Sequence, residues 1–207
     1  TAGPTKDFQG YARGGYEFEA NERYVEAAVG GPISDTLGFR LAGRASKLDG
    51  WIVNTAPARA NPLEPQFPLN AGNSRQPGGK AYAGRLTLAW NPSSDFDVTA
   101  KLFGNYSKEN AESIAEVVCA NPNGLPTTLG IPDIYGDCRL DGRRSSTNAP
   151  TDPALLGPWP GAPADGKHYA KFRGLYGSVT ANYKTGPLTI TSVSGFYDYK
   201  VNTWENF

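Results

Sequence analysis

The segment from Tyr24 to Asn54 constrains the fold more than any other part of the chain. Its side chains alternate between apolar and polar, first over residues 24–30 and again from Leu37 onward, and a period of two is typical of a strand with one apolar face. Residues 31–36, between the two runs, are rich in types that favour turns. We therefore predict a long antiparallel hairpin, with an apolar face, an opposite face that carries arginines, and a returning strand that reaches Trp51 or Asn54.

The same alternation recurs along the chain and predicts an all-β protein. We expect about seven long strands in an antiparallel meander that forms a single domain over residues 1–207, with the strands at about residues 7–19, 24–30, 37–54, 80–90, 96–106, 171–183 and 188–207. The register of the last strand blurs between Ser192 and Gly195, where we expect a bulge. No apolar run approaches the roughly 18 to 20 residues of a membrane helix, which excludes a helical membrane protein.

The connections between these strands are sorted by length. Three short turns fall at one end of the sheet, and two long loops, at about residues 55–79 and 107–167, fall at the other. Outer-membrane barrels have this asymmetry, with short periplasmic turns and long external loops, whereas a soluble sandwich has no reason for it. We predict a partial transmembrane β-barrel, which is an open curved sheet because single-chain bacterial barrels need about eight strands or more to close.

Hydropathy does not decide between lipid and water as the solvent of the apolar face. The mean hydropathy of −0.47 is that of a soluble protein, but a barrel strand places every second residue in the lumen and averages to a polar value. In a soluble sandwich the apolar face would instead pack on a second sheet. The formal net charge of +0 gives no electrostatic reason to expect a nucleic-acid partner.

Three runs of residues resemble a known family. The run from Phe8 to Asn54 looks like the first barrel strands of TonB-dependent outer-membrane receptors, and its specific part is PISDTLGFRLA followed by DGWI. The runs RLTLAWNPSSDFDVTAKL and VTANYKTGPLTITSVSGFYDY are similar to later hairpins of the same barrels. The resemblance covers most of the chain apart from the two long loops.

This resemblance implies a receptor in the bacterial outer membrane that binds and imports a scarce solute, such as a siderophore, a carbohydrate or a vitamin. The implied partners are outer-membrane lipid, a small-molecule ligand, an upstream plug domain of the same parent chain and, through the plug, the TonB energy-coupling protein. The family's barrel has about 22 strands. Because no plug or energy-coupling box precedes Thr1 and the chain has no Met, we expect a processed chain or a fragment that forms the N-terminal third of the barrel. A passive porin segment and a surface or secreted β-sheet binding module remain as alternatives.

Two groups of side chains are candidates for binding. Basic residues recur on the polar strand face, where they would line a lumen and pair with plug carboxylates or attract an anionic ligand; they are Arg40, Arg44, Arg85 and Lys101. Aromatic and cationic side chains in the long loops would line an external vestibule, with ordinary loop surface as the alternative; they are Trp51, Arg59, Arg75, Tyr135, Arg143 and Trp159.

The two cysteines, Cys119 and Cys138, lie in the second long loop, at a spacing unlike that of metal or redox motifs. An oxidising compartment and a long loop favour a disulfide, and two free thiols are the alternative. His168 is the one histidine, too few for a histidine metal site. The chain carries no phosphate-loop or GxSxG motif. We therefore expect no enzyme activity, no cofactor and no metal.

Overall fold

The computed structural model describes most of the 207-residue chain. The described residues are 7–61, 64–110, 116, 119–121, 123–128, 130–145, 147, 161, 163 and 166–204. Among them, no helix has the length and hydrophobicity needed to cross a membrane.

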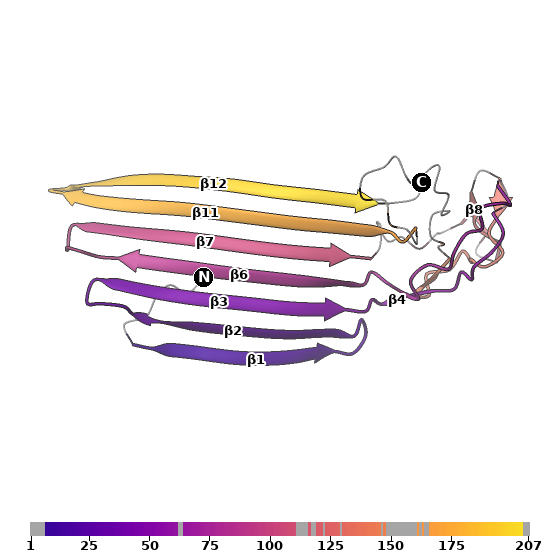
Figure 1. Ribbon diagram of the computed structural model, residues 1–207, viewed down its shortest axis with the longest axis horizontal. Coiled ribbons are helices and arrows are strands. Elements are labelled where there is room, and N and C mark those ends of the chain that lie inside the picture. The colour runs from indigo at the N-terminus through magenta and orange to yellow at the C-terminus, as the bar shows by residue number, and fades with distance from the viewer. Residues whose placement is uncertain are drawn as a thin grey trace.

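A seven-stranded antiparallel sheet dominates the structure (Figure 1). Its strands lie side by side in chain order, as β1 (Gln9–Glu17), β2 (Glu22–Pro32), β3 (Leu37–Leu48), β6 (Gly79–Trp90), β7 (Phe96–Glu109), β11 (Tyr169–Thr185) and β12 (Leu188–Trp204). The predicted all-β meander of seven strands is confirmed. The sheet is open, since β1 and β12 are its two edges and do not pair with each other.

The strand register sorts the side chains of this sheet onto two faces. Val25, Leu41, Leu86, Leu102 and Val179 share what we call the apolar face, because the ladder pairs place their positions on the same side of neighbouring strands. The opposite side, which we call the polar face, carries the four basic residues predicted to share a face: Arg40, Arg44, Arg85 and Lys101. The alternation read from the sequence thus holds in the middle of the central strands β2, β3, β6, β7 and β11.

The apolar face has no second layer over it among the described residues. The buried hydrophobic residues are few and mostly small, namely Ala20, Ala28, Ile52, Ala56 and Cys138. By contrast, Leu102 is 43% exposed, Val179 45% and Phe196 53%. The two-sheet core of a soluble sandwich is therefore not present in the described part of the chain. The large apolar side chains of the sheet remain exposed because no other described element packs on them.

The two ends of the sheet differ as predicted (Figure 1). Residues 33–36, 91–95 and 186–187 make the short turns at one end. At the other end, the connection from β1 to β2 is tight, with Asn21 at a φ of 55°, and the two long loops follow. The loops are shorter than expected at their edges, because β6 begins at Gly79 and β7 continues to Glu109.

The expectation that the strand from Leu37 runs on to Trp51 or Asn54 is wrong. β3 ends at Leu48, and the backbone N–H groups of Asp49 and Gly50 donate to the carbonyl of Ala20 at 3.2 and 3.0 Å. Gly50 has a φ of +110°, a conformation that a residue with a Cβ rarely adopts. The chain therefore turns at Gly50 and leaves the main sheet.

Beyond this turn the long loops form small sheets of their own. β4 (Ile52–Asn54) lies between β5 (Arg75–Gln76) and β10 (Arg143–Arg144) in a three-stranded sheet. β8 (Thr127–Thr128) pairs with β9 (Ile131–Pro132). The loops are thus less irregular than their composition predicts.

The expected bulge in the last strand is also wrong. β11 and β12 pair continuously from Tyr169 opposite Trp204 to Thr185 opposite Leu188, without a slip near Ser192. The apolar pattern is lost there because serines occupy positions on the apolar face, while the pairing with β11 does not change. Ser192 and Ser194 both lie on the apolar face.

Candidate functional site

The three-stranded sheet at the loop end brings together three of the six residues predicted to bind a ligand. Arg143 and Arg75 stand opposite Val53 from its two sides, in β10 and β5. Trp51 directly precedes β4 and is 49% exposed. Segments distant in the sequence therefore converge on one short strand, and the indole and the two arginines belong to one small region.

Arg75 uses its guanidinium within the protein. Its Nε donates to the carbonyl oxygen of Gly50 at 2.8 Å, and its Nη2 donates to that of Glu19 at 2.9 Å. These bonds tie the first long loop to the tight turn between β1 and β2. Arg143 is exposed, so of the two arginines it is the one whose side chain faces solvent.

A second pair of predicted residues meets elsewhere in the loops. The Arg59 guanidinium lies 5.2 Å from the ring centroid of Tyr135 and forms an ion pair with Asp133 at 3.1 Å. The Tyr135 carbonyl accepts a hydrogen bond from the Thr55 hydroxyl at 2.9 Å. Arg59 and Tyr135 therefore join the first long loop to the second. The sixth predicted residue, Trp159, lies outside the described residues.

We expect Arg59→Ala to weaken the association of the two loops by about 1 kcal/mol, the sum of a cation–π contact and a partly exposed ion pair. Hydrogen exchange of the loop amides measures this change. Arg143→Ala is the matched control, because no hydrogen bond or ion pair joins its guanidinium to the described residues, and its effect should be near zero. Equal loss of protection in both variants would contradict the assigned role of Arg59.

A hollow of about 370 Å³ lies where the loops meet the polar face. Trp51 lines it together with Glu22, Ser46 and Glu109, which come from the ends of β2, β3 and β7. An indole surface beside carboxylates and a hydroxyl suits a small polar molecule that stacks on the ring and donates hydrogen bonds. Of the five predicted ligand residues that the structure describes, Trp51 is the one on this hollow.

Farther along the polar face, Arg44 is paired within its own sheet. Its guanidinium contacts Glu26 at 3.3 Å and Glu22 at 3.2 Å and lies 4.2 Å from the Tyr24 ring centroid. Glu26 also accepts from Arg13 at 2.8 Å. Arg44 is thus paired with carboxylates of β2, and this charge cluster fastens β1, β2 and β3 together.

The other three of the four predicted basic residues have no ion pair with a described carboxylate. Thr87 lies between Arg40 and Lys101, opposite both of them, and the Nε of Arg40 is buried without a hydrogen-bond partner in the described structure. Arg85 lies opposite Ala42 and Phe103. These three cations are therefore available to attract a group from outside the sheet.

Aromatic side chains on the polar face of β11 and β12 form a cluster that we did not predict as a site. The Tyr197 and Tyr199 rings stack at 5.3 Å, and Phe172 stacks on Tyr199 at 6.3 Å. Tyr176 lies opposite Tyr197 in the ladder. Their alternation in each strand was visible in the sequence, but the cluster required the register between the two strands.

Comparison with protein-family models, with curated proteins and with solved structures finds no match for this chain. No group of three or more metal-ligating side chains occurs among the described residues. The fold therefore defines the chain only as an all-β protein with a large open antiparallel sheet, and its function has to be argued from the two faces and the loop end.

Proposed function

We propose that this chain is the first part of the β-barrel of a TonB-dependent outer-membrane receptor, which binds a scarce solute at its external loops and imports it. The observation that carries the proposal is the uncovered apolar face. Exposed apolar patches of this extent are rare on soluble monomers. Hydrocarbon is a solvent in which such a face is stable, provided that the sheet is closed by further strands so that no backbone group is unpaired.

The size of the apolar face fits a bilayer. On β7 its apolar residues run from Phe96 to Tyr106, ten steps of about 3.4 Å or roughly 34 Å along the strand. At a tilt of about 45° this length spans about 24 Å, close to the roughly 25 Å apolar band of outer-membrane barrels. The strands are therefore long enough to cross, and β11 and β12 are long enough to project beyond the membrane.

Aromatic pairs lie at both ends of this face. Trp90 and Phe96 meet at 6.1 Å beside a short turn, and Tyr82 and Tyr106 stack at 6.3 Å toward the long loops. Aromatic girdles at both interfaces are typical of transmembrane barrels because the rings are stable at the level of the headgroups. Two such rows on the apolar face support the assignment of its ends to two interfaces.

The polar face and the loop hollow supply the elements of a solute route. In the proposed barrel, the hollow beside Trp51 opens toward the outside of the cell, and the unpaired cations Arg40, Arg85 and Lys101 line the lumen below it. The stacked tyrosines of β11 and β12 add flat surfaces suited to sugar rings or to aromatic ligands. We therefore favour polar solutes that carry rings, which fits the siderophore, carbohydrate and vitamin classes alike.

Uptake by whole cells tests the proposal. We expect cells that carry the full-length gene to accumulate the solute only when the energy-coupling protein is present, because a plugged barrel does not conduct passively. Uptake that is unchanged without the coupling protein identifies a passive porin. A protein recovered in the soluble fraction identifies a surface or secreted binding module, and either result contradicts the proposal.

A further inference from the structure

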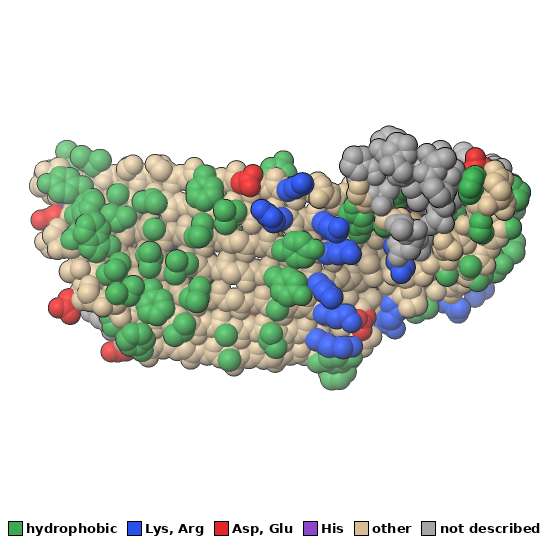
Figure 2. Space-filling view, in the orientation of Figure 1, with side chains coloured by type: hydrophobic (Ala, Val, Ile, Leu, Met, Phe, Trp, Pro, Cys, Tyr) green, Lys and Arg blue, Asp and Glu red, His purple; other side chains and the backbone are tan. Residues whose placement is uncertain are grey.

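A row of basic residues crosses the apolar face near the loop end. Five of them stand directly opposite one another on adjacent strands of the sheet, in the order Arg23, Lys47, Lys80, Lys108 and Lys171. Arg173 and Lys200 form a further opposed pair one pleat away on β11 and β12. We call these seven residues the basic band, and Figure 2 shows it as a line of blue side chains between the apolar side chains of the sheet and the loops.

The charges of the basic band are only partly balanced by the protein. Asp49 pairs with Arg23 at 3.2 Å and with Lys47 at 3.4 Å. Within the described part of the chain, Lys80, Lys108 and Lys171 have no ion pair. Like charges directly opposite each other in a sheet repel and destabilise it. An arrangement of this kind is stable when anions from outside the protein lie between the cations.

The neighbouring side chains suit an amphiphilic anion. The stacked Tyr82 and Tyr106 lie one pleat before Lys80 and Lys108, on the side of the apolar residues. A hollow of about 510 Å³ is lined by Lys47, Arg75, Lys80 and Lys108, by the carboxylates of Asp49 and Glu109, and by Asn73, Ser74 and Asn110. The four cations outnumber the two carboxylates, so an anion held there would meet a net positive charge and amide groups, with an apolar surface directly below it.

The height of the basic band matches a membrane surface. Lys47 lies ten residues along β3 from Leu37, and Lys108 lies twelve residues along β7 from Phe96. These lengths give about 24 to 29 Å of height at a strand tilt of about 45°. If the short turns lie at one interface, the lysines lie at the other, where lipid phosphates are found.

We propose that the basic band binds the phosphate groups of anionic lipids in the leaflet next to the long loops. The inference rests on the proposed function only in placing the apolar face against lipid. Charge complementarity decides the occupant: a row of unbalanced cations above an apolar, aromatic-edged surface fits a molecule with an anionic head and acyl chains. A soluble anion would leave the apolar surface below the band uncovered.

Lipid affinity of the full-length protein in a nonionic detergent tests this assignment. The probe is a short-chain phosphatidic acid, and phosphatidylcholine with the same acyl chains and inorganic phosphate are the reference ligands. The test variant combines Lys80→Gln, Lys108→Gln and Lys171→Gln. The matched control combines Arg85→Gln, Lys101→Gln and Lys184→Gln, which remove the same charge from the same three strands but on the polar face.

We expect the test variant to bind phosphatidic acid on the order of 100-fold more weakly than the wild type, because each basic side chain at an anionic surface contributes about fivefold. The control should keep the wild-type lipid affinity, and added salt should weaken the wild-type interaction. A variant with arginine at the three lysine positions should also keep it. Circular dichroism of each variant verifies that the strands are intact.

Three results would overturn the assignment: equal affinity for the two lipids, equal loss in the test and control variants, or inorganic phosphate binding as tightly as phosphatidic acid. Failure of the proposed function is distinguishable from all three, because lipid affinity is measured without transport. Uptake that does not depend on the coupling protein would contradict the proposed receptor function but not lipid binding by the basic band. Coupled uptake together with no preference for anionic lipid would contradict lipid binding by the basic band but not the receptor function.

Discussion

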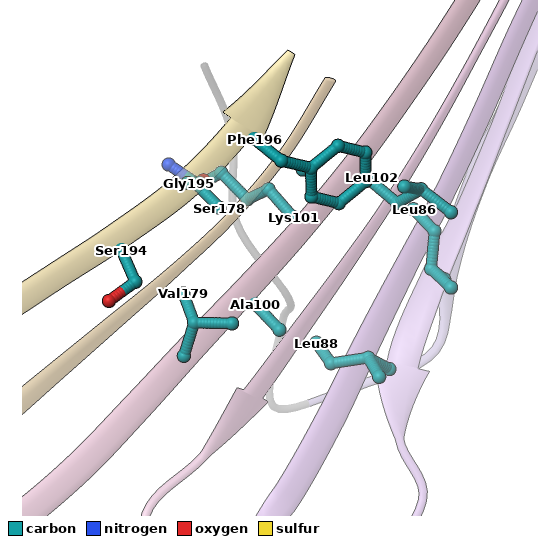
Figure 3. Close-up of a pocket in the computed structure, with 11 residues that line it drawn as sticks. Leu86, Leu88, Ala100, Lys101, Leu102, Ser178, Val179, Ser194, Gly195 and Phe196 are labelled. Carbon is teal, nitrogen blue, oxygen red and sulfur yellow. The ribbon is translucent and has the colours of Figure 1, made fainter. Parts of the chain in front are cut away.

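Replacing Ala100 by arginine is expected to cost about 2–4 kcal/mol of stability in a bilayer, the penalty measured for a basic side chain on the lipid face at mid-depth. Ala100 lies in the middle of the apolar face, in a hollow of about 360 Å³ (Figure 3). Leu86, Leu88, Val179 and Phe196 also line this hollow. The space accommodates a longer side chain, so the penalty comes from placing a charge in hydrocarbon.

The adjacent residue provides the control. Thr99 occupies the polar face of the same strand, opposite Ala89 and Thr180, and Thr99→Arg should cost well under 1 kcal/mol because a lumen position stays hydrated. Ala100→Leu should be neutral or stabilising, because it adds apolar surface next to lipid. Urea unfolding of the full-length protein in lipid vesicles measures all three variants. Equal penalties at Ala100 and Thr99 would show that the apolar face does not lie against lipid.

The sequence alone predicts the main sheet well because its signal is strong and local. Each strand of the meander has a period of two, and an alternation sustained over ten or more residues has few other physical explanations. The order of the strands then follows from the short turns, which leave antiparallel neighbours as the available arrangement. Seven strands and both faces were predictable for this reason.

The end of β3 was missed because apolar residues continue beyond the turn. Trp51, Ile52 and Val53 extend the pattern after Asp49-Gly50, although that dipeptide is itself a turn signal. The hydrogen bonds to the Ala20 carbonyl, which fix the turn, come from a segment almost 30 residues earlier. A long-range contact of this kind decides the local conformation and has no signature in the neighbouring residues.

The expected bulge in β12 has a similar explanation. In the sequence, serines at the apolar-face positions 192 and 194 give the same pattern as a bulge that shifts the register. Only the pairing with the partner strand β11 shows that the residue type changes and the register does not. The ladder of 17 residue pairs with β11 keeps the register, because a bulge would leave backbone groups unpaired. β12 consequently has apolar side chains on both faces.

The candidate sites were less predictable than the strands because they depend on relations between strands. Each lysine of the basic band looks like an isolated residue near the end of its own strand, and the band exists only in the register of six strands. Likewise, the loop residues Arg59 and Tyr135 are chosen from composition, but their contact with each other and the ion pair of Arg59 with Asp133 depend on how two irregular loops fold together. Sequence periodicity indicates on which face of its strand a residue lies, but it says little about which residues of other strands or loops the residue contacts.

The predicted disulfide is present in the structure and accounts for the second large effect. Cys119 and Cys138 are joined, with their Cα atoms 5.2 Å apart, and Cys138 is 2% exposed. The bond closes a segment with a sequence separation of 19, and the chain-entropy model gives about 3 kcal/mol for a loop of this size. Replacing both cysteines by serine should therefore increase opening of this loop about 100-fold.

Limited proteolysis of the full-length protein measures this opening, since cleavage in the loop follows the population of the open state when reclosing is fast. The seven strands should remain intact, because the disulfide lies outside the main sheet, and circular dichroism verifies this. Reduced wild-type protein is the matched control and should be cleaved as fast as the double-serine variant. A cleavage rate unchanged by the substitution, or two thiols that react with an alkylating reagent before reduction, would contradict this role of the disulfide. The loop would then be held by the ion pair of Arg59 with Asp133 and by the pairing of β4 with β10.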